Sequence, residues 1–187
     1  DSCGYAANVE LSRARPACDP DPVCSARPLP DLVATPGVHS IEQVTAYFAV
    51  QPWAVLKSLL YIADGKPWLV VLRGDDEINE IKLLKAVQAR ECRMATDEEV
   101  SATLGVRPGS VGPVGATVPR VVDESVRDDA AYIVGSGRAG FHIRNAFLGR
   151  DFTATITADI RTVHAGDICP VCGQPTLKIQ LEKQNTT

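Results

Sequence analysis

The chain has 187 residues, of which 45% are apolar and 22% are charged, and this balance is typical of a globular protein with a buried core. Its formal net charge of -4 argues against a non-specific nucleic-acid binder, because such proteins normally carry basic surfaces. No apolar run approaches the ~18 residues that a membrane span needs, so we expect no membrane association.

The N-terminal residues indicate a piece of a larger polypeptide. The chain begins Asp-Ser-Cys, with neither an initiator Met nor the basic start and apolar stretch of a signal peptide, so we expect a cytoplasmic location. Residues 1–15 read as a short helix or strand. The following residues, 16–37, are rich in proline and indicate a linker, so the compact domain is expected to begin near Thr35.

The first half of the expected domain changes from helical to strand periodicity. Ser40 and Gln43 form a capping-box pattern before apolar positions at helical spacing. Residues 52–59 fit a second short helix with proline in its first turn. Residues 59–63 and 68–72 then read as two strands, joined by a tight turn at Asp64-Gly65.

The second half mixes helices and short strands. Residues 77–89 return to helical spacing, and Thr96 with Glu99 predicts a capped helix that ends at Gly105. After a glycine and proline loop, strands are expected at residues 118–123, 129–134, 141–146 and 152–157. Pro119 marks the first of these as an edge strand or a strand start. The pattern predicts an α/β or α+β fold with a mixed, mostly antiparallel sheet or barrel surrounded by helices.

Six cysteines are present, and two of them, Cys169 and Cys172, have the spacing of half a zinc ribbon. Without a secretory signal, this spacing favours reduced thiols over disulfides. Cys3 lies near the other end of the chain, and Cys18 or Cys24 could complete a ligand set. We expect a structural zinc at Cys3, Cys169 and Cys172, although an apo protein fits the sequence equally well.

Three features could carry chemistry, and each has an ordinary structural interpretation as well. Lys57 lies among apolar residues, where its ammonium could bind a phosphate or an ester, or could simply reach solvent. Residues 109–113 could present backbone N–H groups to a substrate, or form a plain turn. His142 could border a pocket, or could be a satisfied core histidine.

Eight segments, in order, resemble the insertion domain of bacterial prolyl-tRNA synthetase and the related YbaK-type deacylases. Within the domain they are Thr35-Pro36-Gly37-Val38, Lys57-Ser58-Leu59-Leu60-Tyr61, Arg73-Gly74-Asp75, Gly109-Ser110-Val111-Gly112-Pro113, Asp123 and Phe141-His142-Ile143. In the flanks they are Asp1-Ser2-Cys3-Gly4-Tyr5-Ala6-Ala7-Asn8 and the stretch from Asp159 to Gly173. The resemblance divides the chain into a flank and linker (1–34), an editing domain (35–159) and a C-terminal flank with the Cys-x-x-Cys knuckle (160–187).

The resemblance implies an editing hydrolase that removes alanine from mischarged proline tRNA and spares proline. It implies catalytic roles for Lys57, Gly109 and His142. It also implies substrate contacts by a second set: Thr35, Arg73, Ser110, Gly112, Pro113 and Asp123. Editing itself needs no cofactor, and ATP would serve only the synthetic domain of a full-length enzyme. The implied partners are proline tRNA and the rest of the synthetase, which is expected to be a homodimer.

Two departures from the family pattern keep an alternative open. The family often has His where this chain has Asp76, and an aromatic and glycine stretch where this chain has Ile143-Arg144-Asn145. A domain that has lost catalysis and only helps to bind tRNA or stabilise its host therefore remains a second interpretation. An unrelated zinc-binding interaction domain is a third, which explains the cysteines alone.

Overall fold

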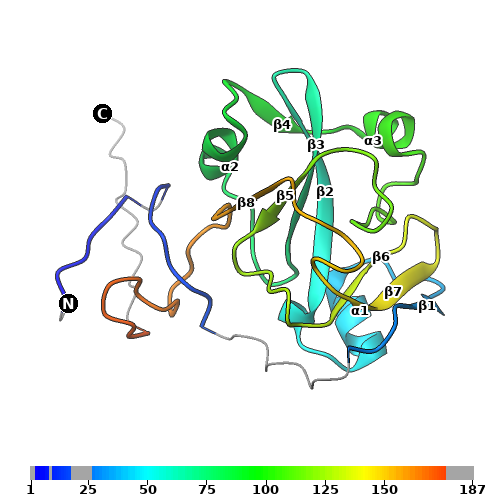
Figure 1. The fold of residues 1–187 in the computed structure, drawn as a ribbon, viewed down its shortest axis with the longest axis horizontal. Coiled ribbons are helices and arrows are strands. Elements are labelled where there is room, and N and C mark those ends of the chain that lie inside the picture. Colours follow the sequence, from blue (N-terminus) through cyan, green and yellow to red (C-terminus); the bar gives the residue numbers. More distant parts are fainter. Residues whose placement is uncertain (1–2, 9, 18–26, 176–187) are drawn as a thin grey trace, which may run out of the picture.

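The computed structural model describes residues 3–8, 10–17 and 27–175. Its regular elements are one sheet and three α-helices around it (Figure 1). Seven strands follow one another across the sheet: β1 (Asp31–Ala34), β7 (Phe141–Ala146), β6 (Tyr132–Gly135), β2 (Val55–Ala63), β3 (Lys66–Arg73), β5 (Arg120–Asp123) and β8 (Ile156–Ala158). An eighth strand, β4 (Cys92–Met94), pairs with the far end of β2. Four of the strand pairings are antiparallel and three are parallel, which confirms the predicted mixed α/β class.

The three helices begin at side chains that cap them. Ser40 and Thr96 form capping boxes before α1 (Ile41–Phe48) and α3 (Asp97–Leu104), as their sequences predict. Asn79 accepts hydrogen bonds from two backbone N–H groups at the start of α2 (Glu80–Val87). Gly105 ends α3 in the left-handed conformation, at φ +69°. Each cap satisfies backbone groups that a short helix would otherwise leave unpaired.

The hairpin of β2 and β3 is confirmed, but the helix predicted before it is wrong. Asp64 and Gly65 both have positive φ, as a two-residue hairpin turn requires, and Ala63 pairs with Lys66. Only Pro52–Ala54 forms a short 3-10 turn, and β2 begins at Val55. The apolar residues after it are buried on both faces of the sheet, so their pattern is continuous and does not distinguish a strand from a helix.

The strand after Pro119 occupies the interior of the sheet. β5 begins at Arg120 and lies between β3 and β8, so Pro119 marks a strand start and not an edge. The last expected strand is displaced along the chain, since β8 covers Ile156–Ala158. Among the described residues, no helix is long and apolar enough to cross a membrane.

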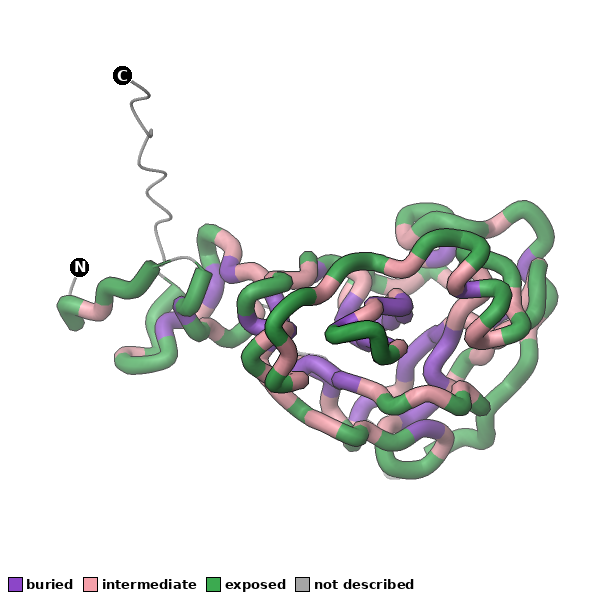
Figure 2. The backbone as a smooth tube through the Cα atoms, turned by 90° about the horizontal axis from the view of Figure 1, so that it is seen from above, coloured by how far each residue is buried: buried purple, intermediate pink, exposed green. Residues whose placement is uncertain are grey.

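Buried residues, purple in Figure 2, lie mainly inside the domain. Clusters of apolar side chains pack on both faces of the sheet. One face carries the largest cluster, in which Leu56, Val122 and Val134 take part. On the other face, Val44 of α1 packs against Val55 and Ile133. Helix α1 therefore covers β2 and β6 close to their first residues.

The two flanking segments lie side by side at one end of the molecule (Figures 1 and 2). Arg15 and Ile168 exchange two backbone hydrogen bonds, of 3.1 and 2.8 Å. The described part of residues 1–15 contains no helix. Conversely, strand β1 falls in the last residues of the segment predicted as a linker, where Asp31 pairs with Arg144.

Candidate active site

Three neighbouring strands bring Lys57 and His142 to the same face of the sheet. Leu56 of β2 is paired in parallel register with Val134 of β6, so the next residues along, Lys57 and Gly135, also lie beside each other. Gly135 is paired in turn with His142 of β7. Because side chains alternate between faces, Lys57, Gly135 and His142 share the face that α1 covers. Two strand spacings separate Lys57 from His142, or roughly 10 Å.

The loop that contains residues 109–113, here called the glycine loop, lies directly against Gly135, between Lys57 and His142. A Cβ atom on Gly112 would lie 1.6 Å from the carbonyl oxygen of Gly135, and a Cβ on Gly135 would lie 2.1 Å from that of Val111. The N–H of Gly137 donates to the carbonyl of Ser110 at 2.8 Å. Neither glycine therefore tolerates a side chain without movement of the backbone, and this contact places the loop over the row of three strands.

Arg120 fixes the far side of the same loop. Its Nε donates to the carbonyl of Pro113 at 3.1 Å, and its Nη2 donates to the carbonyl of Ala116 at 2.6 Å. Because Arg120 opens β5, the loop is tied to the sheet at both of its sides. Gly135 could not be singled out from the sequence, because its contact joins distant segments. Arg120 contacts carbonyl groups only seven and four residues before it, but its residue type does not mark it as a loop anchor.

His142 is buried and is oriented by Thr35. The hydroxyl oxygen of Thr35 lies 2.7 Å from Nδ1 of His142, and Thr35 itself is fully buried. The ring of Phe48, at the end of α1, meets the imidazole edge-on with 6.4 Å between centroids. Burial lowers the pKa of His142 below its ordinary value, and nearby His39 acts in the same direction. The ring is therefore neutral near pH 7, and its contact with Thr35 limits how the ring can turn.

Lys57 is half-buried at the opposite side of the loop. Its Nζ donates to the carbonyl of Gly74 at 3.4 Å. Burial lowers the pKa of Lys57, while Asp76 and the acidic residues beside it act against this shift. The ammonium is thus held at the end of β3 by a backbone carbonyl and by the nearby carboxylates, with its stem among apolar residues.

Two of the predicted substrate contacts are buried side chains that form hydrogen bonds within the domain. Arg73 is only 1% exposed, and its guanidinium makes two hydrogen bonds to Asp75, of 3.0 and 2.6 Å. Asp123 is also buried and accepts from the N–H groups of Ser125 and Ile160. Its strand lies on the other side of β3, roughly 20 Å from His142. In this conformation both side chains serve the packing of the domain, and a substrate contact by either stays a prediction.

A buried ionic cluster joins the C-terminal flank to the end of β3. Arg161 donates to Asp76 at 3.1 Å and also binds Asp167, and all three side chains are buried. Burial raises the pKa of Asp76 to about 6, although Arg161 and Arg73 favour its charged form. Asp76, where the chain departs from the family pattern, is therefore part of the junction between the domain and its flank.

The three cysteines predicted to bind zinc converge across the two flanks. The Sγ atoms of Cys3, Cys169 and Cys172 all lie within 4.8 Å of one another, and those of Cys3 and Cys169 are 3.7 Å apart. Thiolates on a tetrahedral zinc, with bonds of about 2.3 Å, are separated by roughly 3.8 Å. Backbone N–H groups lower the pKa of Cys169 to about 7, which favours a thiolate. The geometry therefore fits zinc. Cys18 and Cys24 lie outside the described residues.

The chain is similar in sequence and in fold to known proteins. A family model described as an aminoacyl-tRNA editing domain matches residues 35–152. A proline--tRNA ligase of Geobacter sulfurreducens is 42% identical over 170 residues, which are 91% of this chain and 29% of that protein. One of Persephonella marina is 39% identical over 94% of this chain and 31% of its own length. The chain thus spans about a third of the length of these relatives.

Solved structures share the fold. One, described as a candidate trans-editing enzyme for prolyl tRNA synthetase, has a TM-score of 0.61 at 20% identity, over 72% of this chain and 87% of the other. The hypothetical protein APE2540 has a TM-score of 0.60 at 22% identity, over 71% and 91%. At these identities the likeness concerns the fold alone.

Proposed function

Because the chain belongs to the aminoacyl-tRNA editing domain family, we propose that it hydrolyses the ester of alanine on mischarged proline tRNA and leaves prolyl-tRNA intact. The observation that carries the proposal is the convergence of Lys57, the glycine loop and His142 on one face of the sheet. We place the reaction in the cytoplasm, with the domain acting in cis beside the remainder of a dimeric prolyl-tRNA synthetase.

Each of the three features has a distinct part in the proposed reaction. Backbone N–H groups of the loop between Gly109 and Gly112 hold the aminoacyl carbonyl and the terminal ribose, so that negative charge developing on the carbonyl oxygen meets fixed donors. Lys57 stabilises the same charge with its ammonium, or binds the terminal phosphate. His142, neutral and oriented by Thr35, borders the aminoacyl group. The attacking water, to which a ribose hydroxyl can donate or from which it can accept a hydrogen bond, then needs only to be oriented, since the ester is already activated.

Discrimination in this proposal is steric. One methylene changes binding by only ~1–3 kcal/mol, so a synthetic site designed for proline rejects smaller amino acids poorly. A second and smaller hydrolytic pocket excludes the larger, correct amino acid by direct clash. The proposal therefore requires that alanine fits beneath the loop and that proline does not.

The proposal is tested by following the loss of radioactive amino acid from alanyl- and prolyl-tRNA that carry the proline anticodon. We expect rapid loss of alanine and a prolyl-tRNA half-life equal to that in buffer alone. If neither ester is cleaved by the chain or by a full-length synthetase that contains it, the domain is a catalytically inactive insertion. Equal cleavage of both esters would contradict the steric argument.

The acidity of the reaction medium gives a second test. Burial lowers the pKa of His142, so the folded protein resists protonating it, whereas the unfolded chain binds the proton near pH 6.5. The folded state therefore loses stability as the pH falls below about 6.5, and kcat/KM for deacylation is expected to fall once the ring is protonated. A pH profile from 5 to 8 checks this, and His39→Gln should move the acid limb slightly to higher pH, because His39 helps to lower the pKa of His142. An acid limb that survives in His142→Gln would assign it to another group.

We also propose that Cys3, Cys169 and Cys172 hold a structural zinc that joins the two flanks. Elemental analysis of purified protein is expected to give about one zinc per chain, and Cys169→Ser is expected to remove most of it. Cys92→Ser is the matched control, because Cys92 lies on β4 within the sheet. Thermal unfolding of the sheet should change little in Cys169→Ser, since the three ligands lie outside it. Purified protein without zinc would contradict the proposal.

A further inference from the structure

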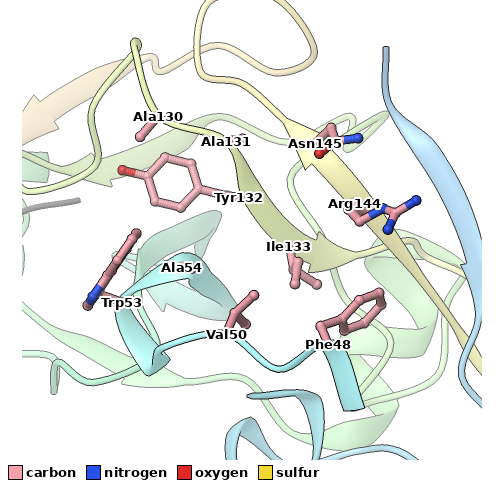
Figure 3. A pocket seen from close by; sticks show the side chains of 10 residues that line it. All are labelled: Phe48, Val50, Trp53, Ala54, Ala130, Ala131, Tyr132, Ile133, Arg144 and Asn145. Atoms are coloured by element: carbon pink, nitrogen blue, oxygen red, sulfur yellow. The ribbon is translucent and has the colours of Figure 1, made fainter. Parts of the chain in front are cut away.

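A pocket that contains none of the predicted site residues lies beside His142 (Figure 3). Its volume is about 310 Å³, which is at the small end of the range for small-molecule sites. Figure 3 shows Trp53 beside Tyr132 at one side, Phe48 and Val50 below, and Arg144 with Asn145 on the strand opposite. The walls are thus largely aromatic and aliphatic, with one guanidinium and one amide at the rim.

The strand register sets the distance between this pocket and the candidate active site. Arg144 lies two residues beyond His142 on β7, and Ile133 lies two residues before Gly135 on β6. Two residues along a strand span roughly 7 Å, and positions two apart share a face. Phe48 forms a wall of the pocket and also contacts the imidazole of His142. The pocket and the candidate active site are therefore adjacent on the same side of the sheet.

The chemistry of the walls fits an unstacked nucleobase. Proteins that bind single-stranded RNA stack bases on aromatic side chains and on guanidinium planes, and asparagine amides can bond the edge of adenine. Trp53 and Phe48 are each half-buried and so keep part of their rings accessible. The guanidinium of Arg144 is about half exposed, and its ion pair with Asp31 at 2.8 Å holds it beside the opening.

We propose that this pocket binds the adenine of the terminal nucleotide of the tRNA acceptor end. The inference rests on the proposed function, because the ester to be cleaved is carried by the ribose of that same nucleotide. Once the ester lies between Lys57 and His142, the attached base has to lie within one nucleotide of His142, and the pocket lies at that distance. Binding the base there adds affinity for the terminal nucleotide beside the glycine loop, while the loop itself orients the scissile ester.

Binding can be measured without hydrolysis. Trp53 and Trp68 are the two tryptophans of the chain, so Trp68→Phe leaves Trp53 as the sole indole. In that variant, the trinucleotide CCA is expected to quench the fluorescence of Trp53 in a saturable way. A trinucleotide with the same phosphates but an abasic terminal residue should bind about tenfold more weakly, a factor that the loss of one stacked base readily produces. Equal binding of the two oligonucleotides would overturn the proposal.

A kinetic measurement separates this inference from the proposed function. We expect Trp53→Ala to raise KM for alanyl-tRNA about tenfold and to leave kcat nearly unchanged, because the indole contacts only the base. Ala131→Phe, which fills the pocket from the residue just before β6, should raise KM in the same way, and thermal melting would confirm that both variants fold. Normal kinetics in both variants would mean that the pocket serves another purpose, such as contact with protein. Preference for CCA over the abasic trinucleotide in a chain without deacylase activity would leave the pocket valid and remove the proposed function.

Discussion

Substitution of Lys57 by alanine is expected to lower kcat/KM for deacylation of alanyl-tRNA by about 100- to 1000-fold. This is the range observed when one group that stabilises a developing oxyanion is removed. The ammonium of Lys57 is held at the end of β3 by the carbonyl of Gly74, where burial strengthens its field. Single-turnover kinetics with labelled alanyl-tRNA would measure the loss in the chemical step itself.

Two further variants separate the charge of Lys57 from its packing. Lys57→Met keeps an unbranched apolar stem and removes the ammonium, so it should be as inactive as Lys57→Ala but more stable. Lys66→Ala removes an exposed lysine at the β2–β3 turn and should leave the kinetics unchanged. Activity within tenfold of the wild type in Lys57→Met would exclude a role for the charge.

Substitution of Gly112 by alanine is expected to abolish most deacylation and also to destabilise the fold by about 2–4 kcal/mol. The added Cβ would lie 1.6 Å from the carbonyl oxygen of Gly135. Because that oxygen belongs to the backbone and cannot rotate aside like a side chain, the loop has to move away from the sheet. Displacement by even 1 Å misplaces the donors that the carbonyl requires. Denaturant unfolding and the deacylation assay would measure the two effects on the same preparation.

Gly115 offers a control three residues further along the same loop. It has φ +74°, but a Cβ there would meet nothing within 4 Å. Gly115→Ala should therefore cost only about 1 kcal/mol of left-handed strain and leave the position of residues 109–113 unchanged. Equal loss of activity in both variants would mean that the loop acts through its flexibility and not through its contact with Gly135.

Local signals in the sequence predicted the elements that local interactions determine. The caps at Ser40 and Thr96, the turn at Asp64-Gly65 and the end of α3 at Gly105 all depend on residues within a few positions of one another. The prediction failed at residues 55–59, where packing on both faces of a central strand overrides any helical pattern. Whether β5 is an edge strand depends on β8, which lies more than thirty residues away along the chain.

For the candidate site too, some residues could be predicted from the sequence, whereas others depend on contacts between distant segments. Lys57, the glycine loop and His142 were predicted from a family resemblance, and the parallel pairing of β2 with β6 is what brings them together. No periodicity reveals that pairing, so the sequence does not point to Gly135. Arg73 and Asp123 have the residue types of substrate contacts, but both side chains are buried and form hydrogen bonds within the domain. The type of a side chain thus gave less information than its partners in the fold.

The backbone bridge between Arg15 and Ile168 bears on how such a domain can be gained or transplanted. It brings the points where the chain enters and leaves the domain within hydrogen-bonding distance of each other. A unit whose two ends meet in this way can be spliced into a surface loop of an unrelated protein without stretching the recipient. The same geometry makes the domain a practical cassette for protein engineering, with residues 15 and 168 as the natural points for grafting.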